Sequence, residues 1–374
     1  MERYRDRRLD YSPAPPFLLP VFHSKLKKGS VRPIPLATTM NVFELTQALV
    51  DIESITGNEA PAGEYIARRL SPLVARHNGH LERMVVEPNR FNVFACWGDP
   101  LVTLSTHIDT VPPYFASSED DDYIYGRGAC DTRGIIASMI CAVDDLLAKE
   151  VRGIGLLFVV GEERNSAGAY HAAKSGRGSR FLINGEPTEN KLAVGSKGAL
   201  RMEVFAGGRM AHSAYPELGE SAIEKLLDAL AEIRRVPLPV DGLLGPSTMN
   251  IGVISGGRAP NVVADEARAE LLIRLVDDGE ATRQAVHEAA GEKAEIRDIL
   301  SIPAAHLGSL PGFETTVVAF TTDIPAFGGA WGEPYLLGPG SIHVAHTADE
   351  RVPKRQLTDA VEIYKNMVQQ LLRG

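Results

Sequence analysis

The sequence predicts an α/β fold, in which a mixed, largely parallel sheet carries helices, together with a smaller inserted α+β domain. Apolar strand-like segments alternate with helix-like segments between residues 40 and 192, which is typical of layered α/β proteins. The segment Ile154–Val160 (IGLLFVV) is apolar throughout, as expected of a strand covered on both faces. From residue 193 to 302 the pattern changes to alternating strands and amphipathic helices, which indicates a separate unit.

The composition narrows the class of protein and its partners. A chain of 374 residues is long for one domain, and 44% hydrophobic with 23% charged residues is ordinary for a globular protein. The net charge of -9 argues against nucleic acid as the main partner. No apolar run approaches the ~18 residues of a membrane helix. The 3 cysteines cannot all pair and lack zinc-cluster spacing, which favours a reducing, cytoplasmic compartment.

Residues 1–39 differ from the rest of the chain. They are rich in arginine, lysine and proline, and their only apolar stretch, Phe17–Phe22, is short and interrupted by Pro20. A signal peptide would have a longer apolar core followed by small residues. We expect a flexible tail, or a start codon assigned too early with Met40 as the true start. A targeting role is a further alternative.

The regular elements begin at Met40. Asn41 is suited to cap the first helix, and helices are expected at 42–52, 59–77 and 135–147. Strands are expected at 81–86, 92–96, 101–104, 154–160 and 181–183. In the inserted unit, strands are expected at 200–205, 248–254 and 267–276, and helices at 220–233 and 278–294. A strand at 334–337 and a helix at 356–372 complete the chain. The first domain therefore combines residues 40–192 and 303–374, and the inserted lid comprises residues 193–302.

The segment Leu101–Pro113 (LVTLSTHIDTVPP) ends a predicted strand with His107 and Asp109. Residues two apart on an extended chain face the same side. A carboxylate beside an imidazole fixes the tautomer of a metal-binding histidine and raises its basicity. A chance His-x-Asp at a strand end is the structural alternative, so the other strand ends decide between the two.

Acidic and histidine side chains follow other predicted strands in the same way. Glu162 and Glu163 follow GLLFVVG, Glu186 follows FLING, and His346 lies beyond PYLLGPG, while Asp131 lies in a glycine-bracketed loop. Ligands of open α/β sheets bind at the carboxyl ends of the strands, so we expect these side chains to meet at one edge. Few lysines or arginines lie nearby in sequence to pair with the carboxylates, and a metal would supply the countercharge.

The charges suit two divalent ions. The carboxylates of Asp131, Glu163 and Glu186 with one bridging hydroxide would balance two such ions, and Asp131 is the candidate to bridge them. Neutral imidazoles combined with carboxylate oxygens suit zinc, with cobalt or manganese as substitutes. Neighbouring residues at a strand end face opposite ways, so only one of Glu162 and Glu163 should bind metal. The other is free to act as the general base of a two-metal hydrolase.

Several motifs in this order resemble the M20 family of metallo-aminoacylases and exopeptidases. They are His107-x-Asp109, GRGACDTRG around Asp131, GEER at 161–164, GEPT at 185–188 and AHTADE at 345–350. The resemblance covers most of the chain from Met40. It is greatest to the acetylornithine deacetylase branch, because LGPGSI at 337–342 precedes AHTADE, and succinyl-diaminopimelate desuccinylase is the sister alternative. Gly161 is a departure, since many relatives have an acidic residue there.

The resemblance implies a zinc-exopeptidase-like catalytic domain with a lid that dimerises, and it implies a role for each motif residue. His107 and Glu186 would bind one zinc, Glu163 and His346 the other, and Asp131 would bridge; Asp109 would orient His107, and Glu162 would be the general base. His212, in GRMAHSAYPELG, would stabilise the oxyanion in a neighbouring active site, and Asn261 and Arg274 would contact the substrate carboxylate. His343 is the alternative to His346, but only His346 stands four residues before a glutamate, as the family places its histidine.

The expected function is therefore a cytoplasmic, homodimeric, two-zinc amide hydrolase. Its substrate would be a small N-acyl amino acid such as N-acetylornithine, from which it would remove the acetyl group in arginine biosynthesis. A desuccinylase or an M20 dipeptidase would use the same metal site. A metal-free scaffold or binding homologue is the alternative outside enzymes.

Overall fold

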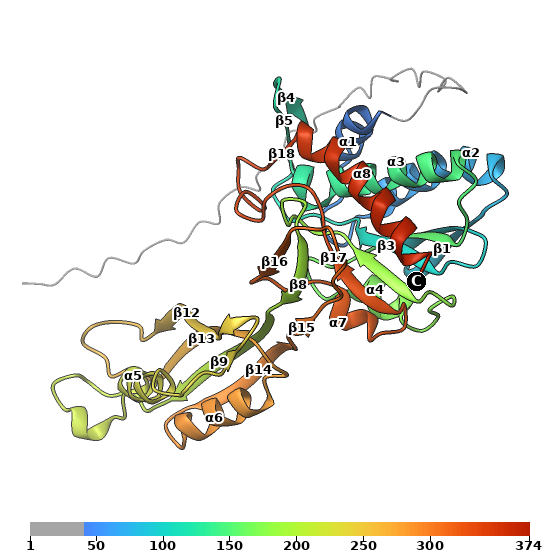
Figure 1. Cartoon of the computed structure of the whole chain (residues 1–374). Helices are drawn as coiled ribbons and strands as arrows, with labels where there is room; N and C mark the ends of the chain where they lie inside the picture. The colour runs from blue at the N-terminus through green and yellow to red at the C-terminus, as the bar shows by residue number, and fades with distance from the viewer. Residues whose placement is uncertain (1–40) are drawn as a thin grey trace, which may run out of the picture. The chain divides into compact units, whose positions relative to one another are not determined.

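The computed structural model describes residues 41–374 (Figure 1). The predictions made for residues 1–39 lie outside the described residues. Within residues 41–374, no helix is both long and apolar enough to span a membrane.

The central sheet has nine strands, and its middle four are parallel. In spatial order these four are β6 (Ile154–Val159), β3 (Val102–His107), β7 (Phe181–Asn184) and β17 (Glu333–Leu336). The antiparallel strands β1 (His80–Glu87) and β2 (Arg90–Trp97) extend the β6 side. On the other side lies β8 (Leu192–Ser196), which pairs with β15 (Ala305–His306) and β16 (Thr315–Val318). The predicted mixed, largely parallel α/β sheet is confirmed.

Helices cover both faces of this sheet (Figure 1). One face packs against α1 (Val42–Val50), α2 (Ala60–Arg76), α3 (Gly134–Ala148) and α8 (Lys354–Leu371). The other packs against α4 (Ala167–Ala172) and α7 (Ile324–Phe327). Because β6 alternates its side chains between the two apolar clusters, every one of its residues is buried. The catalytic chemistry predicted for the ends of these strands therefore rests on a fully packed core.

The expected helix after Asn41 has the expected cap. The Asn41 side-chain oxygen accepts hydrogen bonds from the backbone N–H groups of Phe43 and Glu44, at 2.9 and 3.3 Å. The helices expected at 59–77, 135–147 and 356–372 are α2, α3 and α8, with ends that differ by a few residues. Fraying and capping decide such ends, and the amphipathic pattern does not fix them.

Residues 198–302 form a second, four-stranded antiparallel sheet with its own apolar core. Its strands in spatial order are β12 (Thr248–Gly256), β13 (Glu266–Leu275), β9 (Gly198–Gly207) and β14 (Glu295–Ile302), and its helices are α5 (Ala222–Ile233) and α6 (Glu280–Ala290). The helix expected over 278–294 ends at Ala290, and β14, which we did not predict, follows it. The predicted domain boundaries, 193 and 302, remain a prediction.

Short elements complete the described chain. β4 (Ser118–Glu119), β5 (Tyr123–Tyr125) and β18 (Arg351–Pro353) form a three-stranded sheet, and β10 (Val240–Asp241) pairs with β11 (Gly245–Pro246). The helical turns η1 (Ala129–Arg133) and η2 (Pro216–Leu218) are the remaining elements. The pairing of β18 with β5 matters for the site, because it joins two segments far apart in sequence, next to Asp131 and His346.

Candidate metal centre

His107 is the last residue of β3, and its side chain is 1% exposed. Its Nδ1 lies 3.0 Å from the backbone carbonyl oxygen of Asp109, and its Nε2 lies 2.9 Å from Oδ1 of Asp131. A proton on Nδ1, donated to that carbonyl, leaves Nε2 as the nitrogen that can bind a metal. Strand β3 thus presents Nε2 of His107 at its carboxyl end, where the sequence predicts a metal ligand.

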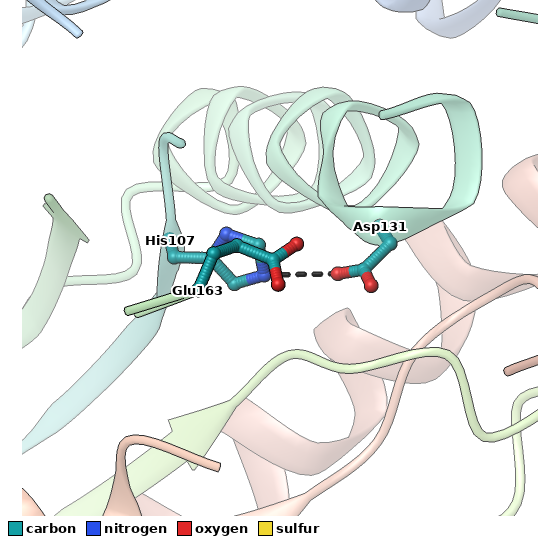
Figure 2. Close-up of side chains that lie close together, drawn as sticks. All are labelled: His107, Asp131 and Glu163. Atoms are coloured by element: carbon teal, nitrogen blue, oxygen red, sulfur yellow. Dashed lines mark hydrogen bonds and ion pairs between the residues drawn. The ribbon is translucent and has the colours of Figure 1, made fainter. Parts of the chain in front are cut away.

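Asp131 is placed by the irregular turn η1, which follows Gly128. Gly128 has a φ of 86°, and a Cβ there would lie 2.8 Å from Cγ2 of Thr110, so the turn needs glycine. Asp131 itself departs from helical geometry, with φ -123° and ψ 79°. Its carboxylate is 6% exposed and faces His107 from the turn (Figure 2).

The second histidine joins the same carboxylate. Nε2 of His346 lies 3.2 Å from Oδ2 of Asp131 and 2.9 Å from Oε1 of Glu163. One ligand atom from each of His107, Asp131 and Glu163 fits within a 4.8 Å group, which Figure 2 shows as a cluster. Asp131 therefore lies between the two histidines, as a bridging carboxylate would. His343, the alternative to His346, is exposed and does not line the cavity described below.

Glu186 and Glu162 complete the predicted acidic set. Glu186 follows β7, is 4% exposed, and its Oε1 has no hydrogen-bond partner among residues 41–374. Burial raises the pKa of Glu186 and of Glu162 well above their usual values. A buried carboxylate oxygen without a partner is costly unless a cation is present, so this donor set fits a divalent metal.

The Asp109 side chain mainly holds the turn that contains Glu162 and Glu163. Its Oδ1 accepts the backbone N–H groups of Gly161 and Glu162, at 2.9 and 3.1 Å. Its Oδ2 accepts the N–H of Glu163 at 3.2 Å and the hydroxyl of Thr56 at 2.8 Å. The carboxylate lies 3.7 Å from Nδ1 of His107, farther than the Asp109 carbonyl. The contact expected between this carboxylate and His107 is thus made chiefly by the main chain, because the side chain is occupied with the turn.

The two glutamates follow a different geometry from the one we expected. β6 ends at Val159, and Glu162 and Glu163 lie in the turn held by Asp109. Strand alternation therefore does not separate them. Glu163 contacts His346, and both glutamates line the cavity.

Charge coupling dominates the protonation of this cluster. Hydrogen bonds that His346 donates to the carboxylates of Asp131 and Glu163 raise its pKa to about 10. Burial opposes the charge on His107, but its hydrogen bond with Asp131 raises its pKa well above the usual value. Burial likewise opposes ionisation of Asp131, yet both histidines lower its pKa. The carboxylates thus favour the protonated, positively charged form of both imidazoles. Bound divalent ions would replace these protons as the positive charges that face the carboxylates.

The cluster opens into a cavity of about 590 Å³. Asp131, Glu162, Glu163, Glu186 and His346 line it from the nine-stranded part. Residues of β13 and β14 line it as well, and the other lining side chains include Arg164, Tyr170, Arg274, Ile299, Leu300, Phe320 and Ile342. The volume suits a dipeptide or an N-acyl amino acid.

Arg274 is one of two arginines that line this cavity, with Arg164. It lies on β13, is half-buried, and its side chain makes no hydrogen bond or ion pair with any residue from 41 to 374. Burial lowers its pKa. The structure thus brings this predicted residue to the cavity.

His212 and Asn261 do not line the cavity. They lie beside each other, since the His212–Val262 bridge joins their segments and Ser213 N–H donates to the Asn261 carbonyl at 3.0 Å. Nδ1 of His212 accepts the Ala214 N–H at 3.1 Å, and both His212 and Asn261 are exposed. The roles expected for His212 and Asn261 therefore remain predictions.

The comparisons with known proteins agree with this geometry. The family model described as peptidase family M20/M25/M40 matches residues 103–370. The chain belongs to this family. A peptidase M20 domain-containing protein of Schizosaccharomyces pombe is 39% identical, covering 94% of this chain and 91% of that protein. A probable carboxypeptidase of Aspergillus niger is 36% identical, covering 86% and 87%.

Solved peptidase structures share the fold. The aminopeptidase PepT of Bacillus cereus aligns with a TM-score of 0.74 at 19% identity, covering 90% of this chain and 100% of that one. The YXEP protein of Bacillus subtilis, described as a dinuclear metal binding peptidase, aligns with a TM-score of 0.63 at 16% identity, covering 87% and 96%. The predicted family is confirmed, and the chain is a hydrolase of the M20 metallopeptidase type. The named relatives are peptidases and carboxypeptidases, so the acetylornithine deacetylase branch remains a prediction.

Sequence reasoning missed three buried residues around this M20 site. Arg127 and Glu350 form an ion pair of 2.6 Å, with side chains 2% and 0% exposed. In the sequence, Glu350 only distinguishes His346 from His343. Asp323, at the start of α7, is buried, and burial raises its pKa to about 7. A buried acid of this kind gives no signal in a single sequence, because Thr-Thr-Asp before a short apolar turn is also typical of a helix cap.

Proposed function

We propose that this protein is a two-metal amide hydrolase that releases an amino acid with a free carboxylate from a short peptide or an N-acyl amino acid. The observation that carries the proposal is the cluster of His107, Asp131 and Glu163 within 4.8 Å, in a cavity that Arg274 also lines. Such a site combines a metal-binding donor set with a cation placed to recognise a carboxylate.

The residues present fit two zinc ions, with cobalt or manganese as substitutes. His107 and Glu186 would hold one ion, Glu163 and His346 the other, and Asp131 would bridge them. When bound, the ions would polarise the scissile carbonyl and lower the pKa of the attacking water. The dinuclear description of the Bacillus subtilis neighbour supports this arrangement.

Glu162 is the proposed general base. It lines the cavity, makes no ion pair with any residue of 41–374, and its pKa is raised by burial. A raised pKa suits a carboxylate that accepts a proton from water and passes it to the leaving amine. His212 would stabilise the oxyanion of a neighbouring subunit in a cytoplasmic homodimer, and Asn261 would assist Arg274.

The charges lining the cavity favour a peptide over N-acetylornithine. The acidic lining residues, Asp131, Glu162, Glu163 and Glu186, all belong to the metal centre, and the other charged lining side chains are Arg164 and Arg274. A cationic ornithine side chain would have no carboxylate of its own to pair with there. Ile299, Leu300 and Phe320 offer apolar contacts instead. The carboxypeptidase names of the relatives support this choice.

N-acetylornithine deacetylation is the second candidate, because LGPGSI precedes AHTADE in this sequence. The substrate panel therefore contains an N-acetylated dipeptide, its C-terminal amide, N-acetylornithine, N-succinyl-diaminopimelate and a free dipeptide. The rate at which the zinc-loaded protein releases free amine is measured for each substrate. We expect the N-acetylated dipeptide with a free carboxylate to react fastest. Faster amine release from N-acetylornithine than from the N-acetylated dipeptide would favour deacetylation as the function.

Arg274→Met tests the carboxylate contact directly. Loss of a charge-assisted pair should raise KM for the free-carboxylate substrate ~10- to 100-fold and leave the amide substrate almost unchanged. Arg268→Met is the matched control, because Arg268 lies on the same strand, is exposed and does not line the cavity. The assignment of Arg274 would be overturned if Arg274→Met and Arg268→Met changed KM equally, or if Arg274→Met changed KM equally for the free-carboxylate and amide substrates.

A further inference from the structure

The segments that carry Asp131 and His346 are joined by backbone pairing just outside the site. Strand β18 pairs with β5 so that Arg351 lies opposite Tyr125. Next to this pair, the N–H of Gly126 donates to the carbonyl oxygen of Glu350 at 3.1 Å. Strand β5 therefore leads into the Asp131 turn, and β18 begins five residues after His346.

The Arg127–Glu350 pair continues this ladder into the protein interior. Nη1 of Arg127 donates to Oε2 of Glu350 at 2.6 Å, and Nε of Arg127 donates to the carbonyl oxygen of Pro113 at 3.1 Å. The guanidinium also lies 5.0 Å from the ring centre of Phe115. Arg127 is thus fixed on several sides, and it fixes the Glu350 carboxylate in turn.

The other oxygen of Glu350 reaches the turn that carries the metal-binding carboxylate. Oε1 accepts the backbone N–H of Asp131 at 3.3 Å and lies 3.8 Å from the sulfur of Cys130. Glu350 therefore touches the main chain of Asp131, and it does not line the cavity. One buried side chain connects the Asp131 turn with the segment that ends in Glu350.

His346 has a backbone conformation that needs support from its surroundings. Its φ is 63°, which is uncommon for a residue with a side chain. It follows Ala345, which is buried, and precedes three exposed residues before Glu350. Glu350 is thus the first buried anchor after His346. If that anchor moves, the distance between His346 and Asp131 is no longer set from this side.

We propose that Arg127 and Glu350 are positioning residues. They hold the Asp131 turn and the His346 segment in the geometry required to bind the metal that Glu163 and His346 would hold. The proposal rests on the proposed metal centre and goes beyond it, because neither residue would touch metal or substrate. Residues that orient metal ligands typically change metal affinity or activity ~10- to 100-fold when they are replaced.

The test is cobalt binding to the metal-free full-length protein, followed by the absorption spectrum of bound Co²⁺. In Glu350→Gln, one oxygen becomes an NH₂ group, which only donates, so the side chain can no longer accept from both Arg127 and the Asp131 N–H. We expect the weaker of the two Co²⁺ equivalents to bind ~10- to 100-fold less tightly, with an altered spectrum. Arg127→Met should do the same, and Arg127→Lys, which keeps the charge, should restore part of the affinity.

Asp145→Asn is the matched control for a lost ion pair. Asp145 pairs with Lys365 at 2.8 Å between α3 and α8, and neither lines the cavity. This variant is expected to lower thermal stability without changing Co²⁺ affinity or spectrum. If Glu350→Gln behaves like Asp145→Asn, the pair is only structural and the proposal is overturned.

Turnover separates this proposal from the proposed function. With zinc at saturating concentration, Glu350→Gln should lower kcat and leave KM within about twofold, because substrate contacts remain. A wild-type protein that fails to bind two Co²⁺ ions would overturn the metal centre itself. A wild-type protein that binds both, with unchanged binding in Glu350→Gln and Arg127→Met, would overturn only the positioning role.

Discussion

At the scale of single residues, the site depends on carboxylates that each satisfy several partners. Asp109 accepts three backbone N–H groups and one hydroxyl, and thereby fixes where Glu162 and Glu163 lie. Asp131 faces a histidine on each side. Replacing either residue would leave buried donors or charges without partners, which is why small changes here should have large effects.

Proton release on metal binding is the first prediction at this scale. With a pKa raised to about 10, His346 is protonated in the metal-free protein at pH 7.5, and it must lose that proton to bind a metal. Metal affinity should therefore rise with pH up to about 10. Protonated His346 also stabilises the metal-free fold, and this stabilisation should be lost as the pH rises from 6.5 to about 10.

Zinc added to weakly buffered protein at pH 7.5 measures this release. His346→Ala should release about one proton fewer than the wild type. His343→Ala is the control, because His343 is exposed and does not line the cavity. Equal proton release from the wild type and His346→Ala would show that His346 does not bind the metal.

At the scale of elements, the ends of strands and the turns after them position the chemistry. β3 supplies His107, the turn after β6 supplies the two glutamates, and β7 leads to Glu186. The η1 turn supplies Asp131 only because Gly128 allows a φ of 86° close to Thr110. Thus backbone conformations outside the strands set the positions of the predicted metal ligands.

Gly128→Ala is the prediction at this scale. The new Cβ would lie 2.8 Å from Thr110 Cγ2, in a backbone region that alanine rarely adopts. We expect a loss of ~1–3 kcal/mol in the free energy of unfolding, measured by urea denaturation, and weaker metal binding because Asp131 shifts. Gly178→Ala is matched for backbone strain, with φ 83° and nothing within 4 Å of its Cβ, and should leave metal binding unchanged. Unchanged stability and metal binding in Gly128→Ala would contradict this account of the turn.

At the scale of the whole molecule, periodicity predicts the sheet, and strand-end chemistry predicts which side chains gather in the candidate metal centre. The buried run Ile154–Val160 contains β6 (Ile154–Val159), and His107, Asp131, Glu163 and His346 lie together, as the sequence leads us to expect. β14 was missed because its sequence, EIRDILSI, mixes charged and apolar residues, and it is largely exposed. Arg127 and Glu350 are 223 positions apart in the sequence, and no local pattern predicts such a contact.

In the proposed function, two metals and Glu162 together hydrolyse an amide in this cavity. The most direct test adds zinc stepwise to the metal-free protein and measures amine release from an N-acetylated dipeptide with a free carboxylate. Glu162→Gln is measured in parallel, with Glu189→Gln as a control, since Glu189 is an exposed acid near Glu186 that does not line the cavity.

We predict no release without zinc and a plateau at about two equivalents. Glu162→Gln should bind the same zinc and release amine ~100- to 10,000-fold more slowly, while Glu189→Gln matches the wild type. Release that persists after chelation, or a Glu162→Gln protein that retains full activity with unchanged zinc content, would contradict the account.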